Sequence, residues 1–134
     1  MVVDTSAIIA ILRDEPERRR FNEIIESVDA CYFSTASLLE TRIVLHSRKR
    51  DRVLLTLDGF MSEADIEIVD VSRDIAEIAF DAFRKYGKGQ GKGAGLNYGD
   101  CFSYALAKEM DLPLLFKGND FSQTDIRAAT ELYS

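Results

Sequence analysis

In this chain of 134 residues, short apolar runs alternate with stretches of helical pattern, and this alternation restricts the possible fold classes. The runs lie at residues 2–3, 31–33, 66–71 and 113–116. Two strands with a helix between them need a crossover connection, which makes them parallel neighbours in a sheet covered by helices. We therefore predict one α/β domain over residues 1–134, with three layers (helices, sheet, helices) around a mostly parallel central sheet.

The helical patterns have recognisable starts. Thr5 or Ser6 is expected to cap a helix over residues 5–12, and Ser72 is expected to cap a helix that ends near Tyr86. Further helices are predicted to open at residues 15–17 and to span about 36–49, 51–64 and 98–110. Of these, the helix opening at 15–17 carries apolar residues at helical spacing, namely Phe21, Ile24, Ile25 and Val28.

Several features predict a cytoplasmic protein without membrane contact. The longest apolar run, residues 7–12, is far shorter than the roughly 20 residues of a membrane span. The N-terminus lacks the basic and apolar regions of a signal peptide. Cys31 and Cys101 form no CxxC pair, and we expect both to be reduced thiols that fill the core.

A single histidine, His46, excludes zinc sites built on several imidazoles. A nucleophile–histidine triad would need His46, which lies in a predicted helix and is expected to be solvated or half-buried. Lys and Arg number 17 against 23 Asp and Glu, giving a net charge of −6. The chain therefore cannot bind nucleic acid as a uniform polycation, and any such contact needs local basic patches or a cation held by clustered acids.

Four aspartates fall at the carboxyl ends of predicted strands or near helix starts, where ligands bind in open parallel sheets. They are Asp4, Asp70, Asp100 and Asp120. Aspartate is also a frequent helix cap and turn residue, so each of them taken alone is more often structural than functional.

Glu40 differs from these aspartates because its predicted helical neighbours, Ala36, Ile43 and Val44, are apolar. An ionised carboxylate there needs either a basic partner, such as Arg42 or Arg48, or a cation shared with other acids. A hard divalent cation removes the repulsion between crowded carboxylates, and a site without histidine points to Mg²⁺ or Mn²⁺. Such a site can generate a hydroxide nucleophile and neutralise charge on a phosphodiester.

Residues 87–95 hold five of the eight glycines. They do not form a P-loop, because Gly93 follows Gly91-Lys92 where Ser or Thr is required. Gly89, Gly91 and Ala94 have the spacing of a dinucleotide-binding GxGxx(G/A) motif, but they follow a helix rather than a strand. Two interpretations stay open, a flexible surface loop and a loop whose lysines meet phosphates. The basic run at residues 48–52 is interpreted as a solvated helix end.

Four segments together resemble the PIN-domain ribonucleases, and specifically the VapC-type toxins of bacterial toxin–antitoxin pairs. Residues 2–7 (VVDTSA) are similar to the family's first strand, first acid and small hydroxyl residue. Residues 34–41 (STASLLET) resemble the motif that carries a helical glutamate. The most specific segment is 96–107 (LNYGDCFSYALA), and 113–121 (PLLFKGNDF) resembles the last motif. The similarity covers essentially the whole chain.

This resemblance implies a Mg²⁺- or Mn²⁺-dependent endoribonuclease that leaves 5′-phosphate and 3′-hydroxyl ends on RNA, with tRNA among the candidate substrates. It also implies a homodimer that is inhibited by a VapB-type antitoxin whose tail reaches the active site. Asp4 and Asp100 would be the metal ligands, and Glu40 would orient or deprotonate the attacking water. The catalytic acids implied are Asp4, Glu40, Asp100 and Asp120, and Asp70 is discarded. The residues implied on the substrate side are Thr5, Ser6, Asn97 and Lys92.

The chain departs from the family pattern after its last strand. Many relatives carry a Thr-x-Asp pattern there, whereas this chain reads Phe116-Lys117-Gly118. Asp120, or Asn119 as a weaker ligand, would take that place, which leaves one or two metal ions open.

Two other functional classes also stay open. A phosphoryl-accepting signalling domain would use a strand-end aspartate and Lys117, although Asp4 lacks the paired acid that such domains need. A non-catalytic PIN-like module would bind RNA or a partner without cleaving it.

Overall fold

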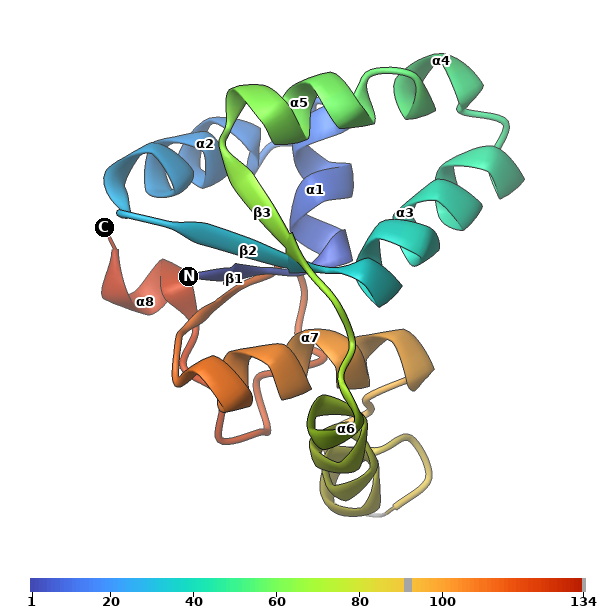
Figure 1. Cartoon of the computed structure of the whole chain (residues 1–134), viewed down its shortest axis with the longest axis vertical. Helices are drawn as coiled ribbons and strands as arrows, with labels where there is room; N and C mark the ends of the chain where they lie inside the picture. Colours follow the sequence, from blue (N-terminus) through green and yellow to red (C-terminus); the bar gives the residue numbers. More distant parts are fainter. Residues whose placement is uncertain (91–92, 134) are drawn as a thin grey trace.

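The computed structural model describes residues 1–90 and 93–133 and forms an α/β fold around a four-stranded parallel sheet (Figure 1). The strand order is β3-β2-β1-β4, and every pair of neighbours is parallel. The elements are β1 (Val2–Val3), α1 (Thr5–Leu12), α2 (Arg18–Ser27), β2 (Cys31–Ser34), α3 (Thr35–Ser47), α4 (Asp51–Leu54), α5 (Leu57–Glu63), β3 (Ile66–Val69), α6 (Arg73–Tyr86), α7 (Tyr98–Met110), β4 (Leu114–Leu115) and α8 (Ala129–Leu132). The predicted fold class is confirmed.

The sheet separates two hydrophobic clusters because successive strand residues face opposite sides. Val3 and Leu115 pack with α1, α2 and α5, whereas Val2 and Leu114 pack with α6 and α7. Figure 1 shows these two helical layers on opposite sides of the sheet. Cys31 lies in the first cluster and Cys101 in the second, both buried as free thiols, so the expectation that they fill the core is confirmed.

The helix predicted over residues 51–64 is wrong, because the structure divides it into α4 and α5. The hydroxyl of Thr56 donates a hydrogen bond to the carbonyl oxygen of Val53 at 2.6 Å, which offers the backbone a local alternative to the helical ladder. Leu55, at the break, is 84% exposed. An apolar side chain that does not reach the core leaves the helix without a packing reason to continue.

Other predicted boundaries differ by a few residues. The third strand ends at Val69 rather than at residue 71, and the second helix begins at Arg18, after the turn that contains Pro16. Ser72 caps α6 as predicted, because its hydroxyl accepts the N–H of Ile75. His46 is exposed, with Nδ1 3.0 Å from Asp51 Oδ1. No helix among the described residues is long and apolar enough to cross a membrane.

Candidate active site

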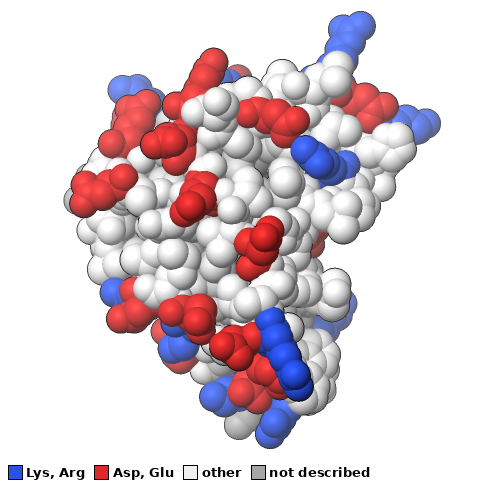
Figure 2. All heavy atoms as spheres, in the orientation of Figure 1, with Lys and Arg blue, Asp and Glu red and all other residues white. Residues whose placement is uncertain are grey.

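The predicted acids lie at the carboxyl ends of the parallel strands. Asp4 directly follows β1, Glu40 lies on α3 just beyond β2, and Asp100 is the third residue of α7. These ends lie on the right-hand side of Figure 1, and Figure 2 shows the surface hollowed there, between the part with α3 to α5 and the part with α6 and α7. Three segments far apart in the chain therefore meet at the carboxyl ends of the strands.

Asp4 is buried, and both of its carboxylate oxygens accept hydrogen bonds. Oδ1 accepts from the hydroxyl of Ser103 at 2.5 Å, and Oδ2 accepts from the hydroxyl of Ser6 at 2.6 Å and from its N–H at 3.0 Å. Asp4 is thus the N-cap of α1, so the prediction that Thr5 or Ser6 caps this helix is wrong. The carboxylate can bend back to its own helix because it is only one methylene long. Capping fixes its orientation at the strand end.

Ser103 was not found from the sequence. It lies one helical turn after Asp100, so both side chains are on one side of α7, and it is completely buried. The sequence signal for Ser103 is a serine three residues after an acid, at the start of the buried part of the same helix. Behind it lies Ser37, whose Oγ is 3.3 Å from that of Ser103.

A layer of buried hydroxyl groups joins α1 to α3 beneath the acids. Thr5 donates a hydrogen bond to the carbonyl oxygen of Ser37 at 3.3 Å, and Thr41 donates to the same oxygen at 2.7 Å. The Thr5 side chain was predicted on the substrate side, but it is buried here, next to Glu40. These hydrogen bonds satisfy polar groups away from water and hold the two helices in register.

Asp100 and Asn97 form a capping box at the start of α7. The Asp100 N–H donates to Oδ1 of Asn97 at 2.8 Å, and the Asn97 N–H donates to Oδ2 of Asp100 at 3.0 Å. Asn97 was predicted to contact substrate, and its side-chain oxygen is used here as a helix cap. Oδ2 is the oxygen of Asp100 that takes part in the box.

The four predicted acids share one electrostatic neighbourhood. The pKa of Asp100 is raised to about 7, mainly by burial and also by the charges of Asp4, Asp120 and Glu40, although the hydrogen bond from the backbone of Asn97 lowers it. Burial also raises the pKa of Glu40, with the Thr5 hydroxyl lowering it and the charge of Asp4 raising it. Asp120 is exposed at the rim. Asp70 is exposed at the end of the edge strand β3 and is not among the charges that act on Asp100.

The surroundings of Glu40 are less apolar than its neighbours in the sequence suggest. Ile43 is 54% exposed, and Glu40 itself is only half-buried, since this side of α3 faces the hollow rather than the core. Arg42, one of the predicted basic partners, instead pairs with Asp58 at 3.1 Å. Within the part of the chain that the structure describes, no salt bridge joins Glu40 to Arg42, Arg48 or any other basic group.

Lys117 is not paired with the acids of the candidate site either. Its ammonium group lies 2.7 Å from Glu15 and 3.3 Å from Glu17, so the lysine that a phosphoryl-accepting site would need is engaged elsewhere. Its backbone N–H donates to the hydroxyl of Ser6 at 3.0 Å, which ties the end of β4 to the group that orients Asp4. Lys92, predicted on the substrate side, lies outside the described residues.

The acid cluster fits a divalent cation with few protein ligands. Among the described residues, no salt bridge joins a basic group to the four acids. In the same part of the chain, no three His, Cys, Asp or Glu side chains are grouped closely enough to hold a metal ion together. Mg²⁺ does not require such a group, because it typically takes one or two carboxylates and completes its shell with water. Asp4 and Asp100, whose charges act on one another, are the two carboxylates that would serve as such ligands.

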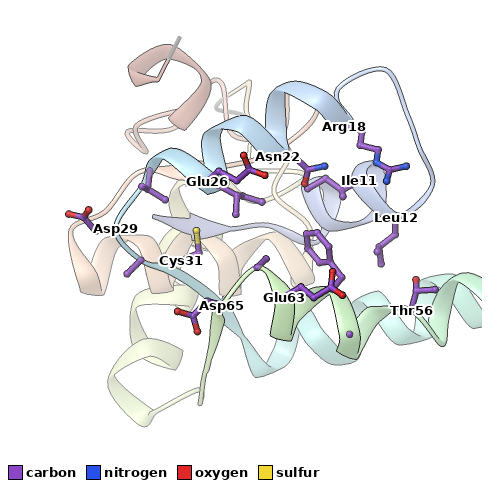
Figure 3. Close-up of a pocket in the computed structure, with 16 residues that line it drawn as sticks. Ile11, Leu12, Arg18, Asn22, Glu26, Asp29, Cys31, Thr56, Glu63 and Asp65 are labelled. Carbon is purple, nitrogen blue, oxygen red and sulfur yellow. The ribbon is translucent and has the colours of Figure 1, made fainter.

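A separate open pocket of about 960 Å³ lies between α2 and α5 (Figure 3). Its lining includes Ile11, Ile25 and Phe60, with charged residues such as Arg18 and Glu63 around them. None of the four acids lines it, so it is distinct from the candidate active site.

The model of the PIN domain family matches residues 1–127. This chain belongs to the PIN domain family. Within that family it is of the VapC type, because it is 49% identical to ribonuclease VapC30 from Mycobacterium tuberculosis over 126 residues. These residues make up 94% of this chain and 95% of the relative.

Solved structures share the fold at low sequence identity. The crystal structure of VapC20 from M. tuberculosis, described as a sarcin-ricin loop cleaving toxin, superimposes with a TM-score of 0.75 at 18% identity and covers 93% of this chain and 95% of that one. A toxin–antitoxin complex from Klebsiella pneumoniae gives a TM-score of 0.64 at 20% identity, covering 90% of this PIN domain and 89% of that chain.

Proposed function

We propose that this VapC-type PIN domain is a metal-dependent endoribonuclease that hydrolyses RNA phosphodiester bonds, with Mg²⁺ as the cofactor and Mn²⁺ as a substitute. The observation that carries the proposal is the convergence of Asp4, Glu40, Asp100 and Asp120 on one charge neighbourhood, with no basic partner among the described residues. The name of its relative VapC30 supports RNA as the substrate.

Each acid has a distinct role in this proposal. Asp4 and Asp100 would hold the cation, with Asp4 kept in place by Ser6 and Ser103. The bound cation supplies charge neutralisation to the phosphodiester and lowers the pKa of water. Glu40, whose pKa is raised mainly by burial, would accept a proton of the attacking water as the water oxygen bonds to phosphorus. The bond from phosphorus to the 3′-oxygen would break, and the leaving 3′-oxygen would take a proton from solvent. Asp120 would complete the cluster at its exposed rim.

Cleavage of RNA by the purified, antitoxin-free protein tests this function. We expect cleavage with Mg²⁺, none in EDTA, and recovery when Mg²⁺ is added back. Asp4→Asn and Asp100→Asn should lower the rate at least about 100-fold, and Glu40→Gln about 10²- to 10⁴-fold through loss of the general base. Asp70→Asn is the matched control, since Asp70 is an exposed strand-end aspartate outside the cluster. Full activity of Asp4→Asn and Asp100→Asn would refute the assignment.

A non-catalytic PIN-like module is the competing function. Calorimetric titration with Mn²⁺ separates the two, because the nuclease requires binding that Asp100→Asn abolishes. A wild-type protein that binds no Mn²⁺ would favour the non-catalytic module.

We further propose that an antitoxin inhibits this protein. The toxin–antitoxin complex that shares its fold supports such a partner. The open pocket between α2 and α5 supports it too, since its lining includes the apolar residues Ile11, Ile25 and Phe60, which a partner segment could contact.

A further inference from the structure

Glu40 lies directly against the backbone of Gly99, the second residue of α7. A Cβ atom built on Gly99 would be 1.9 Å from Oε2 of Glu40 and 2.6 Å from its Cδ. Both distances are well below van der Waals contact, so no other residue type leaves room for the carboxylate where it now lies. Gly99 directly precedes Asp100, which brings the α3 glutamate onto the turn that carries a predicted metal ligand.

We infer that Gly99 is a positioning residue for Glu40, and that its missing side chain is what lets this carboxylate enter the acid cluster. The inference rests on the proposed function for its catalytic consequence, but not for its geometry. The first turn of a helix also presents backbone N–H groups and the positive end of the helix dipole, which favour a carboxylate at this place.

Backbone conformation does not explain this glycine. Among the described glycines, those with positive φ are Gly89, Gly93 and Gly118, so the backbone at Gly99 suits any L-residue. Glycine is also a poorer helix former than alanine. The contact with Glu40 is therefore the feature of the structure that accounts for Gly99.

Two other glycines provide matched comparisons. At Gly87 an added Cβ would be 2.4 Å from the carbonyl oxygen of Phe83, a backbone atom that cannot move away cheaply. At Gly59, within α5, it would meet nothing within 4 Å. The obstacle at Gly99 is the far end of a flexible side chain, so alanine there should displace Glu40 and leave the fold intact.

Gly99→Ala tests the inference, with Gly59→Ala as the control. We expect kcat for RNA cleavage to fall about 10- to 100-fold in Gly99→Ala, with KM within about threefold of wild type, and no change in Gly59→Ala. The midpoint of thermal unfolding should stay at or above the wild-type value in both. A crystal structure of metal-free Gly99→Ala should show the Glu40 carboxylate displaced from the first turn of α7.

A double-mutant cycle with Glu40→Asp assigns the effect to this contact. The shorter aspartate does not reach Gly99, so adding Gly99→Ala to Glu40→Asp should change kcat less than about threefold. If Gly99→Ala itself folds poorly, Gly99→Ala/Glu40→Ala should recover the wild-type unfolding midpoint when the clash is the cause, and failure to recover it would overturn the inference.

An undisplaced Glu40 in the metal-free Gly99→Ala structure, or a kcat within twofold of wild type, would also overturn it. A wild-type protein that cleaves no RNA would instead defeat the proposed function, while the displacement of Glu40 would still decide the positioning role.

Discussion

Asp100 is the acid of the cluster whose pKa is raised by burial and by all three of the other acids. It is 8% exposed, and burial together with the charges of Asp4, Asp120 and Glu40 raises its pKa from 3.8 to about 7. Its ionised form is therefore disfavoured in the metal-free protein, although one of its oxygens accepts a hydrogen bond from Asn97. A divalent cation reverses this preference because it binds the ionised form.

The metal-free protein should lose stability as pH rises from about 4 to about 7. In this window folded Asp100 holds a proton that the unfolded chain has released, so the free energy of unfolding falls with increasing pH. Asp100→Asn should reduce this slope, whereas exposed Asp70→Asn should leave it unchanged. Urea denaturation in EDTA between pH 4 and pH 8 measures it, and an equal slope in wild type and Asp100→Asn would contradict the assignment.

At pH 7, Mg²⁺ at about 100 times its dissociation constant should stabilise the wild type by about 2.7 kcal/mol. Asp100→Asn should show little of this stabilisation.

Helix α7 is the element that contributes most to the site. Its N-cap Asn97, its glycine Gly99, its acid Asp100 and its buried hydroxyl Ser103 occupy two successive turns. The N-terminal end of α7 therefore fixes the position of Asp100 and gives room to the Glu40 carboxylate from α3. It also supplies the hydroxyl that donates to Oδ1 of Asp4. Loss of order in its first turn should affect binding of the cation before it affects the core.

Asn97→Ala should destabilise the protein by about 1 kcal/mol, the usual effect of removing an N-cap, and should weaken Mn²⁺ binding. Asn97→Ser keeps a capping oxygen and should restore both properties. Chemical denaturation and calorimetry measure them. If Asn97 also contacts substrate, Asn97→Ser will raise the KM for RNA at wild-type stability, and an unchanged KM would leave capping as its role.

On the scale of the whole molecule, an apolar patch remains exposed where α6 meets α7. Phe80 is 59% exposed and Tyr98 is 80% exposed, and together with Phe102 they border a groove of about 290 Å³. Exposed aromatic clusters of this kind mark interfaces more often than free surface. The patch supports the homodimer that the family resemblance implies.

Phe80→Arg should convert a dimer of this protein into a monomer, because a desolvated guanidinium without a partner opposes association. Light scattering on the eluting protein measures the mass. Leu55→Arg, at an apolar residue that is still more exposed but lies between α4 and α5, is the control and should not change it. A wild-type protein that is monomeric at micromolar concentration would contradict the homodimer.

Local patterns were sufficient to predict most elements. The bounds of α7 and the Ser72 cap of α6 agree with the prediction, because the apolar spacing and the capping residue lie within one segment. The break at Thr56 was missed, since a helical pattern over residues 51–64 does not reveal that Leu55 fails to reach the core. The cap of α1 is Asp4 rather than Thr5 or Ser6, because the helix begins at Thr5 and the Asp4 carboxylate accepts the N–H of Ser6.

The sequence by itself determined the alternation of strands and helices, the parallel sheet that follows from it, and the four acids that the motifs single out. Only the tertiary structure decided that Ser103 donates to Asp4 across 99 positions of the chain, that Arg42 pairs away from Glu40, and that Glu40 lies on Gly99. The physical reason is the range of the interactions. Periodicity and capping act over a few residues, whereas these contacts exist only after the helices on both sides of the sheet have packed.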